Sequence, residues 1–466
     1  MVSVLALLGC AGAALAFPGP DVIVGDCSGI SNYGSVGTTP NRIFAYAVGT
    51  TSCNAGTQPL MWVANTNQHP VIAQNFYRFR MVNGAGQFEH IGGGHLKHGY
   101  TALQQTLCFS DCQPTGGTTL GVHCSDPYVS SLNGTQTRLG PRDDINPYNG
   151  FYNMPWTSRG TANSSVINRR LQVLEVDIDP NMNNNANLNA IYICEGQYVA
   201  PDDAISGNGT NNASWRRITR GGTTSNWTFN VTSTTVREQA AIFAWPTLES
   251  GVTIETLVVP GEEQYRGTMH VAYKVTPIAG GMYHYEYMVH NQTSHIGANS
   301  FTVNFPSGGQ TSCIDTVNVG FRDIFYHSME PYDGTDWAGT KTSSGYQWVG
   351  PTFATAPNGN ALRWSTSYSF RFDSNRPPVM GTGTIGLFRT GGSMSVNILV
   401  PDTCACPDPD INCDGAVNGV DVEVAEAVVG GDMTDFCGTD ADLNGDGAVN
   451  GNDVEYQELR VGGAPC

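Results

Sequence analysis

The sequence has few charged residues, and basic residues are the scarcest of them. Charged side chains make up 13% of the 466 residues, and only 22 are Lys or Arg. Proteins that bind nucleic acid present a basic stripe or patch to the phosphates, and the sequence contains neither. After the first 16 residues, no apolar run approaches the ~20 residues that cross a bilayer. These deficits argue against nucleic-acid binding and against a transmembrane segment.

The motifs of several enzyme classes are also missing. The sequence has no G-x-S-x-G nucleophile elbow, no H-E-x-x-H zinc motif and no phosphate-binding P-loop. Nothing in residues 17–400 therefore identifies a reaction, and the sequence leaves open whether the protein is an enzyme.

Glycine and small polar residues are abundant, and they divide the chain into short segments. Segments rich in Val and aromatic residues between turn-forming residues predict strands. They are residues 171–179, 268–276, 282–291, 383–389 and 394–400. Because amphipathic helical patterns are absent here, we expect a mainly β, sandwich-like extracellular body over residues 17–400.

Three parts of this body are expected to form loops. Residues 180–190 and 205–214 are rich in Asn or Gly and predict long loops. Residues 64–150 are expected to form a loop-rich insertion with a glycine turn at 92–94. Cys108, Cys112 and Cys124 would staple this insertion through disulfides, with zinc binding by Cys108 and Cys112 as the alternative.

The first 16 residues have the pattern of a secretory signal peptide. A short apolar run is followed by small residues and Ala14-Leu15-Ala16, which fits cleavage before Phe17. Leu7-Leu8-Gly9-Cys10 also fits a lipidation motif, so an anchor at Cys10 is an alternative. We therefore expect a protein that is secreted or held at the cell surface.

Twelve cysteines follow Cys10, an even number that suits disulfides in an exported protein. Seven lie in the body and five in residues 401–466. Either one disulfide joins the two parts or each part keeps a free thiol. Cys404, at the junction, is the candidate for the bond that crosses.

Acidic residues are concentrated in the C-terminal tail, residues 401–466. The tail contains 15 acidic side chains and one basic one, Arg460, whereas residues 1–400 contain 25 acidic and 21 basic ones. Two twelve-residue segments of the tail, 410–421 and 442–453, are identical at nine positions. Such a block of like charge is either disordered or neutralised by cations, and the regular spacing favours cations.

The two segments place oxygen-bearing residues as a calcium loop does. Ca²⁺ takes six to eight oxygen ligands, and Asp or Asn stands at positions 1, 3, 5, 9 and 12 of each segment. Position 6 is Gly, where the chain turns sharply, and position 7 would offer its carbonyl. The predicted ligands of two Ca²⁺ ions are Asp410, Asn412, Asp414, Ala416, Asn418, Asp421, Asp442, Asn444, Asp446, Ala448, Asn450 and Asp453.

Apolar residues around these loops predict a small helical module. The valines at position 8, Val417 and Val449, are expected to pair the loops or plug the core. Helices are expected over residues 421–429, with Val422, Ala425 and Val429 on one face, and over residues 453–461, with Val454 and Val461. Cys413 could pair with Cys437, and Cys406 with Cys466.

The loops are similar to EF-hand calcium loops, with Asp instead of Glu at position 12, and residues 406–466 resemble type I dockerin repeats. The resemblance implies that each loop is followed by one helix. It also implies docking onto a cohesin-like or cell-surface partner through positions 10 and 11, here Gly419-Val420 and Gly451-Asn452. Residues 98–104 and 360–364 of the body resemble secreted bacterial domains that precede such tails, which implies no particular activity.

Three groups of body residues could carry chemistry. A histidine cluster could bind zinc or copper, or simply make hydrogen bonds; it is His90, His95, His98 and His123. Two carboxylates could flank a glycosidic bond, or be solvated or loop-capping; the candidates are Glu286, Asp323, Glu330 and Asp333. Aromatic rings could stack on sugars or fill the core; these are Trp337, Trp348, Tyr332 and Tyr346, whereas Trp364 is expected in the core.

We therefore expect a secreted or cell-surface protein in which the calcium-binding tail serves attachment or assembly and the β body is structural or binds a ligand. The alternative is a polysaccharide-degrading hydrolase that carries a dockerin-like module. A metal-dependent enzyme built on the histidine cluster is a third reading.

Overall fold

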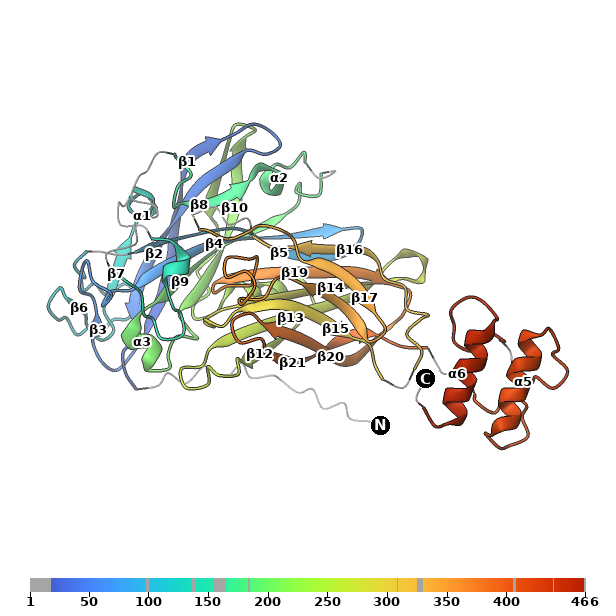
Figure 1. The fold of residues 1–466 in the computed structure, drawn as a ribbon. Helices are drawn as coiled ribbons and strands as arrows, with labels where there is room; N and C mark the ends of the chain where they lie inside the picture. Colours follow the sequence, from blue (N-terminus) through green and yellow to red (C-terminus); the bar gives the residue numbers. More distant parts are fainter. Residues whose placement is uncertain are drawn as a thin grey trace, which may run out of the picture.

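The computed structural model describes residues 18–97, 100–135, 140–154, 165–182, 185–307, 309–324, 330–404, 408–438 and 440–464, with the backbone alone at 95–97. The expected signal peptide and Cys10 lie outside these residues. The described chain is mainly β, as predicted (Figure 1). In this part of the chain, no helix combines the length and apolar character needed to cross a membrane.

Four antiparallel sheets form most of the body, and a fifth pairs only two short strands, β3 (Leu60–Met61) and β6 (Thr119–Leu120); the strand orders of the four are as follows. The first sheet is β1 (Val22–Val36), β2 (Ile43–Asn54) and β7 (Ser125–Tyr128), with β8 (Leu171–Leu174) also paired to β2. The second is β11 (Asn226–Val231), β10 (Ala213–Thr223), β9 (Ile191–Val199), β4 (Val71–Val82) and β5 (Ala85–Lys97). The third is β12 (Thr253–Val258), β13 (Thr268–Pro277), β14 (Tyr283–Asn291), β19 (Thr366–Ser374) and β16 (Val317–Arg322). The fourth is β17 (Ala338–Thr342), β18 (Gly345–Val349), β15 (Ala298–Asn304), β20 (Pro378–Leu387) and β21 (Ser393–Pro401).

Shorter elements connect these sheets. They are β3 (Leu60–Met61), β6 (Thr119–Leu120), α1 (Ser130–Thr135), η1 (Arg142–Asp144), α2 (Glu175–Ile178), α3 (Pro201–Ile205), η2 (Ala241–Ala244), α4 (Trp245–Leu248) and η3 (Ala279–Gly281).

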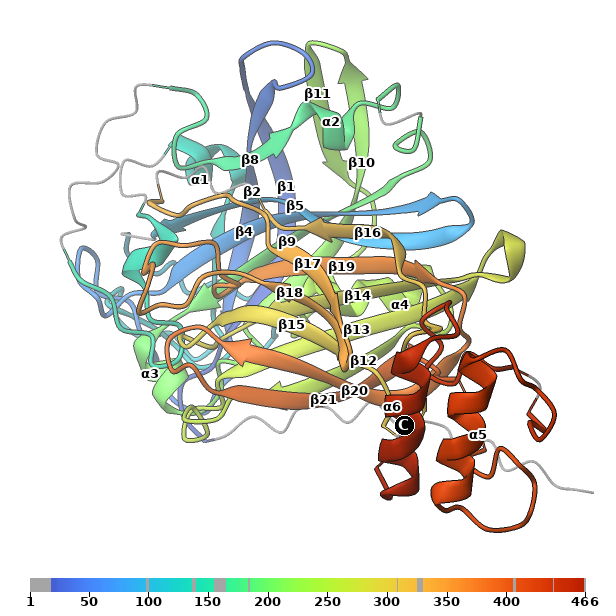
Figure 2. The ribbon, with the colours of Figure 1, turned by 45° about the vertical axis from the view of Figure 1, so that its right-hand side comes forward.

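The sheets are stacked in four layers, in the order of their numbering (Figure 2). Phe44, Phe76 and Phe229 belong to one core between the first and second sheets. Tyr287 and Phe301 belong to another between the third and fourth sheets. A third apolar cluster, with Tyr77, Phe88 and Met288, joins the second sheet to the third. The inner two sheets are therefore covered on both faces, and β4, β9, β14 and β19 are buried along most of their length rather than on alternate residues.

Two sequence-based expectations about the body were wrong. Residues 71–97, placed in a loop-rich insertion, form the long strands β4 and β5. Gly92 and Gly94 lie inside β5 and not in a turn, because a Cβ at Gly92 would meet the Gln172 carbonyl at 2.2 Å and glycine lets β8 approach. Residues 171–179 form β8 and then α2, not one strand.

Four disulfides join eight of the ten cysteines that the structure describes. Cys53–Cys108 and Cys112–Cys124 staple the loops after β5, so Cys108 and Cys112 each have a partner and neither is free for zinc. Cys313–Cys404 crosses from the body toward the tail, which confirms the expected role of Cys404. The fourth, Cys413–Cys437, lies in the tail and was also expected. Cys406 and Cys466 lie outside the described residues.

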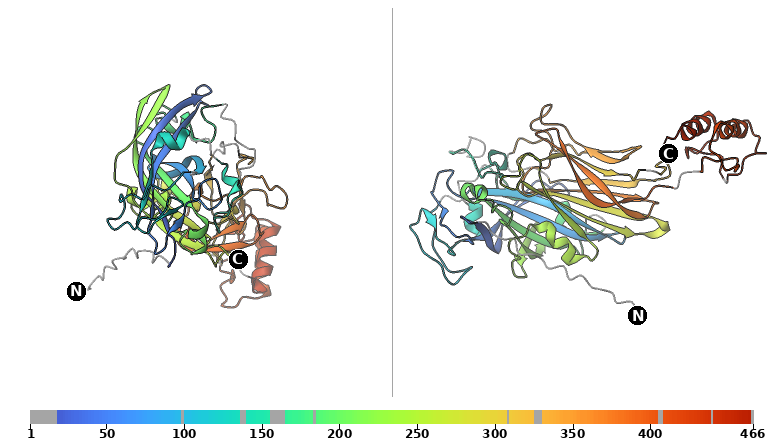
Figure 3. Two further views of the ribbon diagram at one scale, coloured as in Figure 1. Left: turned by 90° about the vertical axis from the view of Figure 1, so that its left-hand side faces the viewer. Right: turned by 90° about the horizontal axis from the view of Figure 1, so that it is seen from below.

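The tail contains two helices, α5 (Gly419–Val429) and α6 (Gly451–Val461), side by side at one end of the body (Figure 3). Their core is formed by Ile411, Val424, Ala425, Val428 and Leu443. The position-2 residues of the two loops, Ile411 and Leu443, therefore plug the module. Val417 and Val449 at position 8 are each 45% exposed, which corrects their predicted role. On α5, Ala425 is buried as expected, but Val429 is exposed.

Candidate functional site

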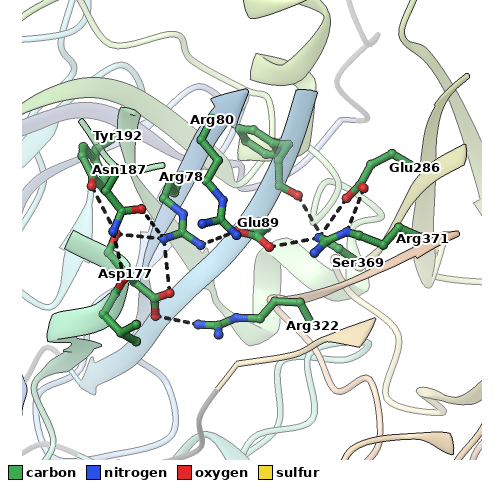
Figure 4. A network of polar contacts seen from close by, with 12 residues as sticks. Arg78, Arg80, Glu89, Asp177, Asn187, Tyr192, Glu286, Arg322, Ser369 and Arg371 are labelled. Atoms are coloured by element: carbon green, nitrogen blue, oxygen red, sulfur yellow. Dashed lines mark hydrogen bonds and ion pairs between the residues drawn. The ribbon is translucent and has the colours of Figure 1, made fainter. Parts of the chain in front are cut away.

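A network of charged side chains crosses the interface between the second and third sheets (Figure 4). Arg78 on β4 and Glu89 on β5 are cross-strand partners, so both side chains point to the same face and form an ion pair. Glu286 on β14 and Arg371 on β19 are likewise partners. Arg371 binds Glu286 through two bonds, Nε–Oε2 at 2.8 Å and Nη2–Oε1 at 3.0 Å. Arg371 Nη2 also reaches Glu89 Oε1 at 2.9 Å, which joins the two sheets.

The network continues to α2 and β16. Asp177 on α2 accepts Arg78 Nη1 at 3.3 Å and Arg322 Nη2 at 2.6 Å. Arg80 lies 3.4 Å from Glu89. Burial alone would raise the pKa of Glu89, but Arg78 and Arg371 outweigh it and hold that pKa well below its usual value. The buried charges therefore compensate one another, and Glu89 is not available as a proton donor.

A cavity of about 260 Å³ opens beside the network, and His284 lines it with Arg371, Asp373, Asn318 and Gln87. His284 Nδ1 lies 2.7 Å from Asp373 Oδ1, and its Nε2 lies 3.1 Å from Glu286 Oε2. Burial lowers the pKa of His284, but the two carboxylates outweigh burial and raise it. With a carboxylate on each ring nitrogen, both imidazole nitrogens of His284 already have partners. The charged side chains that line this cavity are therefore engaged with one another or with Glu286.

The four carboxylates considered for glycoside hydrolysis have separate partners. Glu286 binds Arg371, and Asp323 accepts a hydrogen bond from Asn360 Nδ2 at 2.5 Å. Burial raises the pKa of Asp323 to about 6, although the Asn360 bond opposes the shift. Glu330 accepts the backbone N–H of Arg142 at 2.8 Å, and Asp333 caps a turn through Thr335. These partners differ from one carboxylate to the next.

The histidine cluster is not assembled by the residues that can be placed. His90 is buried, stacks on Tyr77 and interacts with the Gly92 carbonyl, whereas His123 binds Asp111 at 2.7 Å near the surface. His98, and the side chain of His95, lie outside the described part of the chain. Within that part, no three or more His, Cys, Asp or Glu side chains are grouped to hold a metal.

The candidate sugar-stacking rings are mostly in the core. Trp337 and Trp348 are 3% and 0% exposed, and Trp364, expected in the core, is 4% exposed. Tyr346 packs on Trp348 with ring centroids 4.9 Å apart, and Tyr332 lies under the Arg363 guanidinium at 3.5 Å. These rings do not form an exposed platform for a sugar.

The two acidic loops of the tail fold alike. In loop one, Asp410 accepts the backbone N–H groups of Asp414 at 3.2 Å and Gly415 at 2.9 Å. In loop two, Asp442 accepts those of Asp446 at 3.0 Å and Gly447 at 2.7 Å. Gly415 and Gly447 have φ of 89° and 90°, the left-handed region in which glycine is favoured, so position 6 makes the turn that brings positions 1 and 5 together.

The remaining oxygen-bearing residues also repeat between the loops. The side-chain oxygen of position 3 accepts the N–H of position 5 in both, from Asn412 at 3.0 Å and from Asn444 at 2.8 Å. The position-9 amide donates to the position-7 carbonyl at 3.1 Å in both, Asn418 to Ala416 and Asn450 to Ala448. The predicted ligand positions of each loop are therefore close neighbours along the turn.

Position 12 closes each loop and begins a helix. Asp421 is fully buried, and Asp453 is 1% exposed. Each accepts the N–H of the position-9 asparagine, at 2.8 and 2.7 Å, while that asparagine caps the helix, so each pair forms a capping box. Each carboxylate also accepts a second backbone N–H, from Ile411 at 3.0 Å or from Asn444 at 3.2 Å, and a hard cation bound by the loop oxygens would add positive charge beside it. The loops therefore offer oxygen donors of the kind that Ca²⁺ takes, but no three of their carboxylates come together in the described part of the chain.

Loop two also contacts the body. Gln310 Nε2 donates to the Leu443 carbonyl at 2.7 Å, and Ser312 Oγ donates to the Asn444 carbonyl at 3.3 Å. The Cys313–Cys404 disulfide lies beside these contacts in the chain. A change in the conformation of loop two would therefore alter these hydrogen bonds to Gln310 and Ser312 at the edge of the body.

Comparisons with known proteins add little to this geometry. No protein-family model matches the chain, and no curated protein matches it in sequence. One solved structure, a Vibrio cholerae VesB protease, aligns over 81% of this chain and 99% of its own at 8% identity. Its TM-score of 0.13 is too low to show a shared fold.

Proposed function

We propose that this is a secreted or cell-surface protein whose tail binds two Ca²⁺ ions and serves attachment or assembly, while the β body is structural or binds a ligand. The repeated geometry of the two loops is the observation that carries the proposal. Asp410, Asn412, Asp414, Asn418 and Asp421 would hold one ion together with the Ala416 carbonyl, and the equivalent residues of loop two would hold the other. The ions would supply positive charge to a tail that contains fifteen acidic side chains and only one basic residue, Arg460.

An extracellular location agrees with the disulfides and with the sequence of the first 16 residues. The exposed Cys413–Cys437 bond would not persist in a reducing cytosol. The resemblance to dockerins supports a protein partner for the tail, either cohesin-like or on the cell surface. Gly419-Val420 and Gly451-Asn452, at positions 10 and 11, begin the two helices and would meet it.

A structural or binding role for the body is favoured over hydrolysis because its candidate carboxylates are occupied. Glu286 is held by Arg371 and His284, and the other three carboxylates have partners of their own. The full-length protein should release no new reducing ends from a panel of soluble and insoluble polysaccharides. Release from one substrate, lost in Glu286→Gln or Asp323→Asn, would favour the hydrolase instead.

Hydrogen exchange of the full-length protein, with calcium or with a chelator, tests the module. We expect amides of α5 and α6 to exchange faster in chelator, because the loop carboxylates then repel one another. Strands β13 and β14 are the internal control and should not change. Equal exchange of α5 and α6 in both conditions would contradict calcium binding.

Retention on the producing cells tests attachment separately. The protein should remain with the cell surface in calcium and appear in the medium after chelation. Asp414→Asn combined with Asp446→Asn should release it without chelator, whereas Asp432→Asn, outside both loops, should not. Release that does not depend on calcium would contradict attachment while leaving calcium binding intact.

A further inference from the structure

Two cysteines in the core of the body have no disulfide partner. Eight of the cysteines that the structure describes form the four disulfides given above, and Cys27 and Cys194 are the remaining two. Both are fully buried in the apolar core between the first and second sheets. They are far apart in the sequence, since Cys27 lies on β1 and Cys194 on β9.

The two thiols face each other across this core. The Cys27 and Cys194 thiols are close enough for Cys194 to raise the pKa of Cys27, and the Cys27 thiol donates to the Ser214 carbonyl on β10 at 3.7 Å. Arg216 on β10 is the cross-strand partner of Cys194, so the two side chains share a face. Arg216 Nη1 donates to the Cys27 carbonyl at 2.9 Å, which shows that this face meets β1 at Cys27.

The surroundings of Cys27 and Cys194 argue against metal binding and nucleophilic catalysis, and they favour a disulfide between the two thiols. Metal binding would need further ligands, and no group of three or more His, Cys, Asp or Glu side chains is placed for a metal in the described part of the chain. Nucleophilic chemistry would need access to solvent, and both side chains are 0% exposed. We propose that Cys27 and Cys194 form a disulfide within the body, in addition to the four described, which bonds the first sheet to the second through their shared core.

Bond formation removes one proton and one electron from each thiol. The two electrons pass to a disulfide oxidant, of protein or small-molecule type, which leaves as two thiols. In the folded chain the contact with Cys194 and burial raise the pKa of Cys27, so the reactive thiolate is scarce. The bond therefore forms before the two sheets close over it, and once formed it is protected from reductants.

Peptide mapping of the full-length secreted protein tests the proposal directly. Trypsin separates the two cysteines, since Cys27 lies on the peptide that ends at Arg42 and Cys194 is the single cysteine of residues 171–216. The protein is denatured in excess alkylating agent without reductant and then digested. We expect these two peptides to be joined and unalkylated. Finding both cysteines alkylated would overturn the proposal.

Reduction of the native protein provides a second measurement. The Cys413–Cys437 bond is exposed, so mild reductant should open it first, while the Cys27–Cys194 bond should open only when denaturant is added. Cys194→Ala should expose one additional alkylatable thiol, that of Cys27. Two alkylatable thiols in the wild-type protein at these positions, or none in Cys194→Ala, would contradict the pairing.

Discussion

The body and the tail both carry carboxylates that need compensation, and they solve the problem in different ways. In the body, Glu89 is surrounded by Arg78, Arg80 and Arg371, all supplied by neighbouring strands. In the tail, Asp421 and Asp453 are buried and accept hydrogen bonds from backbone N–H groups, and Arg460 is the one basic residue of residues 401–466. The charge of a carboxylate paired with arginine is neutralised within the fold. A buried carboxylate without a basic partner depends on cations from the solution. The comparison therefore predicts that the body is stable in chelator and that the tail is not.

The largest effect is expected from removing the anion at the centre of the body network. Glu89→Gln leaves Arg78 and Arg371 buried without their shared partner and should lower the free energy of unfolding by about 3–5 kcal/mol. Chemical unfolding of the body, followed by tryptophan fluorescence, measures this. Glu263→Gln, an exposed acid, is the control and should leave the unfolding curve unchanged. A small loss in Glu89→Gln would mean that the arginines are not the compensating charges.

The body also contains buried carboxyl groups whose pKa is raised, and Asp126 is one of them. Burial raises the pKa of Asp126 to about 7, against hydrogen bonds from Leu103 and Trp62 that lower it. The folded state therefore holds a proton that the unfolded state has released, and stability falls as the pH rises from about 4 to about 7. Asp126→Asn should remove up to about 4 kcal/mol of this pH dependence. Identical pH profiles of Asp126→Asn and wild type, in urea unfolding, would contradict the buried proton; Asp315→Asn, at an exposed site, is the matched control.

The smallest change in stability is expected at exposed apolar residues of the tail, in contrast to a buried residue of the same loop. Val417→Ala and Val449→Ala should each change stability by less than about 0.5 kcal/mol, because both side chains are largely exposed. Ile411→Ala, at a buried position of the same loop, should cost about 2–4 kcal/mol. Thermal unfolding in calcium measures both. A larger loss from Val417→Ala than from Ile411→Ala would restore the original expectation that position 8 plugs the core.

The sequence predicted the strand pairs whose turns are local. Residues 268–276 and 282–291 are β13 and β14, and residues 383–389 and 394–400 lie largely within β20 and β21. Strands β4 and β5 were missed because their glycines were taken as a turn. Glycine is needed at these positions because β8 packs closely against β5 there. The two strands are far apart in the chain, so no local sequence pattern shows this contact.

The charge network was missed for a similar reason. Arg78 and Arg80 alternate along β4, and Glu89 stands opposite on β5, so a strand prediction there would have revealed the first ion pair. The partnership with Arg371 depends on two sheets meeting face to face, which sequence spacing does not encode. The tail loops were easier to recognise in the sequence, because all the oxygen-bearing residues of each loop lie within twelve consecutive positions and the motif occurs twice.

Calorimetric titration of the chelator-stripped full-length protein with calcium tests the central claim most directly. The account predicts two bound ions per chain, one in Asp414→Asn or Asp446→Asn, and two in Asp432→Asn. A folded wild-type protein that binds no calcium at millimolar concentration would contradict it.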